Sequence, residues 1–116
     1  MRQQVIERFN RTFGMVARKT DKVLAWDVRP DLGVVVFTDT PSNGHYAKVC
    51  VPYPLGMKEL PPNARRAHSE KRHSNTFASP GLRRGAPALY FWIRGARELD
   101  ETVQFVSEMP PIPSHG

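Results

Sequence analysis

The sequence predicts an α+β domain in which two helices cover one face of an antiparallel sheet of about four strands, in the order α-β-β-β-loop-β-α. Helical apolar spacing occurs near both ends of the chain, strand-like apolar runs lie between, and proline- and glycine-rich turns separate those runs. With 116 residues, 40% of them hydrophobic, the chain can form one domain with a packed core. We place this domain at residues 1–109 and an extended proline-rich tail at 110–116.

The first element is an amphipathic helix. Val5, Phe9, Phe13 and Val16 recur at spacings of four, four and three residues, which places them on one face of a helix. We expect this helix to end within residues 18–21, where basic side chains suit the negative end of the helix dipole and the apolar spacing stops.

Three strands follow as a meander. Residues 22–28 alternate between two sides, and residues 34–38 form a continuous β-branched and aromatic run that is typical of a central strand. The third strand covers residues 46–51 and alternates again. Turns are predicted at 29–33, which holds a proline and a glycine, and at 40–44, which ends in Asn-Gly.

The last strand and the last helix complete the domain. Residues 88–94 alternate in the manner of a strand with one buried face. A helix is predicted from about 98 to 108, because Leu99, Val103 and Val106 share one face and its first turn is acidic. The prolines after Met109 end this helix.

A long segment at residues 58–85 has no hydrophobic period and carries nearly all of the net charge of +6. It holds seven basic and two acidic residues, whereas the rest of the chain holds ten and nine. Clustered cations replace counterions on a nucleic-acid backbone, which predicts a phosphate-contacting loop; the alternative is a solvated loop that is basic for solubility. The candidate contacts are Arg65, Arg66, Lys71, Arg72, Arg83 and Arg84.

Strand alternation predicts a second candidate surface on the sheet face away from the helices. If the apolar residues at 47, 49 and 51 and at 89, 91 and 93 face the helices, their neighbours point outward. The outward candidates are Tyr46, Lys48, Tyr90, Trp92 and Arg94. Such a face stacks bases while it neutralises phosphates. Alternatively, these aromatic side chains pack under the long loop or against a second subunit.

Catalytic, metal and cofactor sites are not expected. No phosphate-binding glycine loop or nucleophile elbow is present, and Cys50, the one cysteine, excludes an intramolecular disulfide. Its apolar neighbours indicate a buried structural thiol. An alternative from the enzyme class is a metal-dependent nuclease that uses Asp27, Asp31 and Asp39 at strand ends to hold Mg²⁺.

We therefore expect a non-catalytic nucleic-acid-binding protein with an accessory or regulatory role, which binds DNA rather than RNA. A protein adaptor whose basic loop meets an acidic partner is the other alternative, and a homodimer or a protein partner stays open. No apolar run approaches the ~20 residues that cross a bilayer, and no signal-peptide pattern is found. We expect a cytoplasmic protein with no membrane partner.

Overall fold

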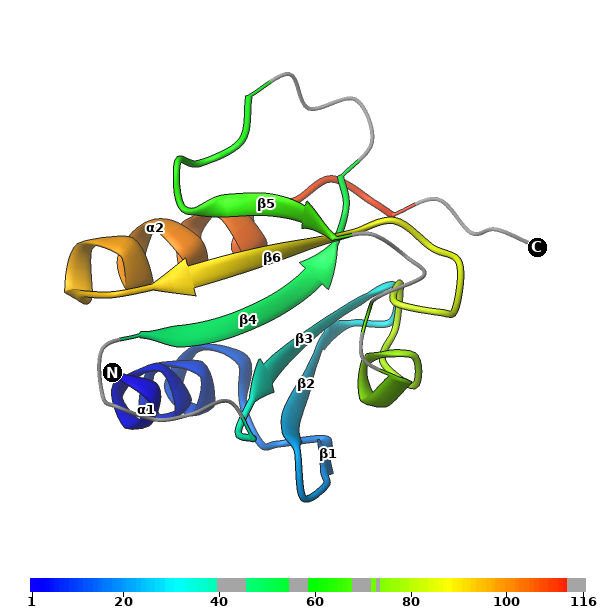
Figure 1. Ribbon diagram of the computed structural model, residues 1–116, viewed down its shortest axis with the longest axis horizontal. Helices are drawn as coiled ribbons and strands as arrows, with labels where there is room; N and C mark the ends of the chain where they lie inside the picture. The colour runs from blue at the N-terminus through cyan, green and yellow to red at the C-terminus, as the bar shows by residue number, and fades with distance from the viewer. Residues whose placement is uncertain (40–45, 55–58, 68–71, 73, 113–116) are drawn as a thin grey trace.

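The computed structural model describes residues 1–39, 46–54, 59–67, 72 and 74–112. In chain order its elements are α1 (Arg2–Phe13), β1 (Arg18–Lys19), β2 (Val23–Arg29), β3 (Leu32–Phe37), β4 (Ala47–Pro52), β5 (Ala64–Ala67), the short 3₁₀ helix η2 (Ser74–Thr76), β6 (Ala88–Ile93) and α2 (Ala96–Ser107). The strands form one antiparallel sheet in the order β1-β2-β3-β4-β6-β5, and both helices pack on the same face of it (Figure 1). The described chain forms a single compact α+β domain.

The predicted α+β class with two helices is confirmed, but the sheet has six strands rather than about four. The two additional strands, β1 and β5, lie at opposite edges of the sheet (Figure 1). We missed β5 because its Ala-Arg-Arg-Ala sequence has no apolar alternation and lies inside the segment that we interpreted as a loop. It pairs with β6 along its whole length.

The first helix is shorter than expected, and this correction accounts for β1. It ends at Phe13, because Gly14 has a φ of 91°, a conformation that glycine adopts without the strain other residues incur. The chain leaves the helix there, and Arg18–Lys19 pairs with β2. The second helix begins two residues before the expected start at 98 and ends one residue before the expected end at 108.

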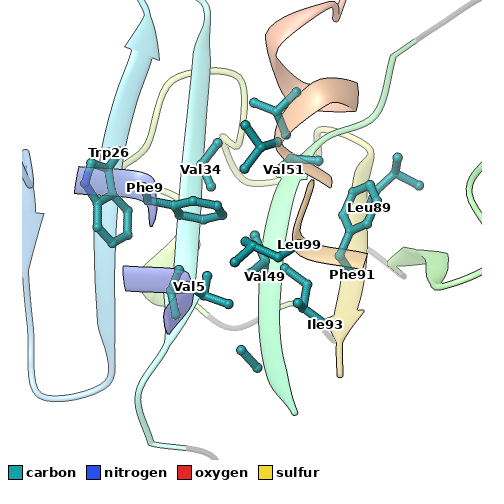
Figure 2. Packing of buried hydrophobic residues seen from close by; sticks show 14 of the residues in the cluster. Val5, Phe9, Trp26, Val34, Val49, Val51, Leu89, Phe91, Ile93 and Leu99 are labelled. Carbon is teal, nitrogen blue, oxygen red and sulfur yellow. The ribbon is translucent and has the colours of Figure 1, made fainter. Parts of the chain in front are cut away.

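The helix face of the sheet, which is the side that α1 and α2 cover, carries the larger hydrophobic core. It joins apolar side chains of both helices to alternate residues of the central strands, and Figure 2 shows how Val5 and Phe9 of α1 and Leu99 of α2 lie over the strands. Phe9 of α1 packs edge to face on Trp26 of β2, with ring centroids 5.3 Å apart. The predicted inward set of β4 and β6 is confirmed: Ala47, Val49, Val51, Leu89, Phe91 and Ile93 all belong to this core.

The outer face, which is the opposite side of the sheet, has a smaller core. Residues from β2, β3, β4, β5 and β6 pack there with Leu82, which comes from the segment 74–86 and is fully buried. This segment lies close to β3: the Gly33 N–H donates to the Pro80 carbonyl at 2.7 Å, and a Cβ at Gly33 would lie 2.7 Å from the Ser79 Cβ. A larger residue at position 33 would therefore push the segment off the sheet.

A C-terminal strap follows α2 and returns to the turn between β2 and β3. The Arg29 guanidinium donates to the carbonyl of Met109 at 2.6 Å and to that of Pro110 at 3.1 Å. Asp31 accepts a hydrogen bond from the backbone N–H of Ile112 at 2.8 Å and pairs with Arg29 at 3.0 Å. Residues 113–116 of the predicted tail lie outside the described residues.

Neither α1 nor α2, at 12 residues each, is long and apolar enough to cross a membrane.

Candidate functional site

Strand register brings together side chains from three strands on the outer face. Lys48 of β4 lies opposite Trp92 of β6, and Tyr90 lies opposite both Cys50 of β4 and Arg65 of β5. Residues directly opposite each other in antiparallel strands point to the same face of the sheet. We call the surface formed by Lys48, Arg65, Tyr90, Trp92 and Arg94 the outer strip.

Lys48 lies at the centre of an aromatic cluster. Its Nζ is 4.3 Å from the centroid of the Tyr90 ring, 5.2 Å from that of Phe37 and 5.8 Å from that of Trp92. Tyr90 stands nearly perpendicular to both neighbouring rings, at 78° to Phe37 and 83° to Trp92. The rings hold the ammonium by cation–π attraction, which leaves its charge on the surface side of the sheet. Lys48, Tyr90 and Trp92 are each half-buried.

Phe37 is a member of this cluster that sequence reasoning missed. It is 3% exposed, so it supports Lys48 and Tyr90 from below and offers little surface of its own. Its neighbour Val35 points to the same outer face. The prediction treats residues 34–38 as a continuous buried run without assigning their side chains to faces, and alternation within that run places Phe37 on the same face as Val35.

A pocket of about 250 Å³ opens beside Trp92 and is lined by Pro62, Asn63, Arg65, Trp92 and Arg94. Asn63 is 7% exposed and fixes the backbone of Trp92 twice: its Nδ2 donates to the Trp92 carbonyl at 2.9 Å, and its own carbonyl accepts from the Trp92 N–H at 3.0 Å. Pro62 and Asn63 had no signal in the sequence, because they join the site only through the pairing of β5 with β6.

The doublet Arg65-Arg66 does not act as one unit, because β5 is a strand and its successive side chains point to opposite faces. Arg65 lies on the outer face opposite Tyr90 and lines the pocket. Arg66 lies opposite Leu89, on the side of the sheet that the helices cover, and its guanidinium is 5.2 Å from the Tyr53 ring. Only Arg65 belongs to the outer strip.

Arg72 is buried against the outer face instead of being offered to solvent. It is 4% exposed, its guanidinium stacks on the Phe77 ring at 5.0 Å, and its Nη2 donates to the Arg83 carbonyl. Its Nε and Nη1 are buried without a hydrogen-bond partner. Burial lowers the pKa of Arg72, since a charged group is disfavoured away from water.

Arg83 and Arg84, the other candidate loop cations that the structure describes, lie away from the outer strip. Arg83 and Arg84 are exposed in the segment 74–86, which leads into the start of β6, and about 13 Å of strand separates that start from Trp92. Arg83 lines a different pocket, of about 420 Å³, together with Asp31. Lys71 lies outside the described residues, and Tyr46 is half-buried just before β4.

The three carboxylates of the nuclease alternative do not meet. Asp31 precedes β3 and Asp39 follows it, so the two lie roughly 25 Å apart along the strand direction. Asp27 is exposed on β2, and Asp31 is engaged by Arg29 and the strap. Throughout the described ranges, no group of three or more His, Cys, Asp or Glu side chains could hold a metal ion.

Cys50 is a structural thiol in this arrangement. It is fully buried in the outer-face core, and burial raises the pKa of its thiol to about 12. The neighbouring cations Arg72 and Lys48 lower that pKa only in part. The thiol therefore stays protonated at neutral pH and is not an activated nucleophile.

No protein-family model, curated protein or solved structure matches this chain. Function is therefore inferred from the side chains of the outer strip and their chemistry.

Proposed function

We propose that this protein binds nucleic acid through the outer strip. The observation that supports this most is that the Lys48 ammonium lies near the Tyr90 and Trp92 rings. Arg65 and Arg94 line the same pocket as Trp92. Cations neutralise phosphates and aromatic rings stack on bases, and sheet-type binders of nucleic acid combine the two.

The charges of the outer strip are largely available to a ligand. Among the residues that the structure describes, neither Lys48 nor Arg65 forms an ion pair with an acidic side chain, and Arg65 donates only to backbone carbonyls, those of Pro62 and Ala64. Arg94 is exposed and pairs with Glu98 at 3.9 Å. Exposed pairs of this kind contribute little, so a phosphate can replace the carboxylate.

The neighbouring arginines of β5 offer a matched test, because they share a charge and a strand but lie on opposite faces. Arg65→Ala is expected to weaken binding to oligonucleotides several-fold and to reduce the slope of log K against log[salt] by about 1. Arg66→Ala is expected to leave both nearly unchanged. The measurement is a fluorescence-anisotropy titration of DNA and RNA oligonucleotides, single- and double-stranded, at two salt concentrations.

The slope of log K against log[salt] for the wild type tests how many cations contact phosphates. Three cations that each meet one phosphate give a slope of roughly −2 to −3. An absence of binding at low salt, or equal losses in the two arginine variants, would contradict the proposal.

An acidic polypeptide such as poly-glutamate separates this proposal from the adaptor alternative. A polyanion without bases should compete weakly, because it has nothing to stack on Trp92 or Tyr90. Competition as strong as that of an oligonucleotide would favour an acidic protein partner instead. We also propose a cytoplasmic location, as the sequence predicts. Size-exclusion chromatography would reveal the homodimer that the sequence leaves open.

A further inference from the structure

We propose that Trp92 takes one unpaired base, so that the ligand of the outer strip is single-stranded nucleic acid rather than duplex; this rests on the proposed function.

The Trp92 residue is restrained at its backbone and on one side of its ring. Asn63 holds the Trp92 backbone through two hydrogen bonds, and the near-perpendicular Tyr90 ring supports the indole from the side. Trp92 nevertheless stays half-buried and lines an open pocket. A ring that is held in place and still reachable loses little freedom when a base stacks on it, which favours binding.

The polar edge of this indole is also available. Within the described part of the chain, no residue accepts a hydrogen bond from the Trp92 Nε1, whereas the Nε1 of the other tryptophan, Trp26, donates to the Asn10 Oδ1 at 3.1 Å. A buried indole N–H is normally satisfied by a partner. The free N–H of Trp92 can donate to a base edge or a phosphate oxygen.

The cations are distributed as a single strand requires. Arg65 and Arg94 line the same pocket as Trp92, and Lys48 lies on the opposite side of the Trp92 strand. A base stacked on the indole therefore has a cation on either side for the phosphates that flank it. In a duplex, both faces of each base are covered by neighbouring base pairs, and a base must leave the stack before it can reach Trp92.

The test compares a single-stranded oligonucleotide with a duplex of the same sequence, using the full chain. Wild type should bind the single strand at least 10-fold more tightly than the duplex. Trp92→Ala should lower single-strand affinity by about 10- to 100-fold and leave duplex affinity unchanged. Trp92→Phe, which keeps an aromatic platform, should retain most of the affinity.

Tryptophan emission gives a readout that does not depend on the folding of the alanine variant. Trp26 is fully buried in the helix-face core, so it serves as an internal reference. Addition of the single strand should quench part of the wild-type emission, and this quenching should be absent in Trp92→Phe.

The outcomes separate the two proposals. Equal affinity for the single strand and the duplex, or unquenched wild-type emission at saturation, overturns the single-strand inference. If Arg65→Ala still weakens binding in that case, the proposed function stands. If neither form of nucleic acid binds, both proposals fail.

Discussion

The two faces of this sheet use the same strands for different purposes. On the helix face, α1 and α2 close a continuous apolar core. On the outer face, the segment 74–86 covers one end of the strands with Leu82, and the other end carries a lysine among aromatic rings. Within β6 the division falls between neighbours: Phe91 is fully buried, and Trp92 is half-buried beside a pocket. Two neighbouring residues of β6 thus have different roles: Phe91 stabilises the core, and Trp92 lies in the candidate site.

The two tryptophans show the same contrast. Trp26 is fully buried, packs on Phe9 and has its indole N–H satisfied by Asn10. Trp92 has a supporting ring on one side and an open pocket on the other. A tryptophan held at its backbone and left accessible at its ring serves contact with another molecule better than it serves the core.

The largest expected effect comes from breaking this contrast within β6. Phe91→Ala removes a fully buried ring that packs on Phe105 and should lower the free energy of unfolding by ~3–5 kcal/mol. Trp92→Ala should lower it by less than ~1.5 kcal/mol, because its ring is only half-buried. Urea unfolding followed by circular dichroism measures both values. A stable Phe91→Ala would mean that the register of β6 is shifted by one residue, which would exchange the two faces.

A smaller effect is expected where the segment 74–86 covers the outer face. Leu82→Ala should cost ~2–3 kcal/mol, because Leu82 is fully buried but belongs to the smaller core. Arg84→Ala, an exposed position in the same segment, is the control and should change stability by less than ~0.5 kcal/mol. Equal values for the two variants would show that the segment does not pack on the sheet in solution.

Arg72 is a charged side chain buried against the outer face, where the hydrophobic core is the smaller of the two. Arg72→Met keeps most of the side-chain volume and removes two buried donors that have no partner. We expect a change in unfolding free energy within ~1 kcal/mol of zero, because the lost desolvation cost offsets the lost stacking on Phe77. Thermal unfolding of Arg72→Met and Arg72→Ala tests this, and the alanine variant should be the less stable of the two because it leaves a cavity.

The smallest effect concerns Asp31, which joins the strap to the turn between β2 and β3. The hydrogen bond from Ile112 and the Arg29 side chain hold the pKa of Asp31 below its usual value of 3.8. A carboxyl whose pKa is lower in the folded state stabilises the fold above its unfolded pKa, and this contribution is lost as the pH falls through the lowered value. Asp31→Asn should therefore be less pH-dependent in stability below about pH 4, with binding at the outer strip unchanged. If the unfolding free energy of Asp31→Asn depended on pH as steeply as that of the wild type, the attribution of this pH dependence to Asp31 would be wrong.

The sequence predicts those features that depend on a local period. Alternation in residues 46–51 and 88–94 placed Val49 and Phe91 on the helix face, because the side-chain period of a strand is two. The sequence could not predict where a segment without a period would dock. For that reason β5, the separation of Arg65 from Arg66 and the burial of Arg72 were all missed, since each depends on tertiary pairing.

The pairing of β4 with β6 also bears on the order in which the protein folds. Strands β2 and β3 are joined by a turn of two residues, whereas the connection between the paired strands β4 and β6 runs from Tyr53 to Pro87. The two ends of this connection meet, because the Tyr53 N–H donates to the Pro87 carbonyl at 3.0 Å. Closing a long loop costs more chain entropy than closing a tight turn, and contacts distant in sequence slow folding. We expect pulsed hydrogen exchange during refolding to protect the β2–β3 hairpin first. Lys48 and Trp92 would then become neighbours only after this hairpin has formed, so a chain arrested at the hairpin stage would lack the outer strip.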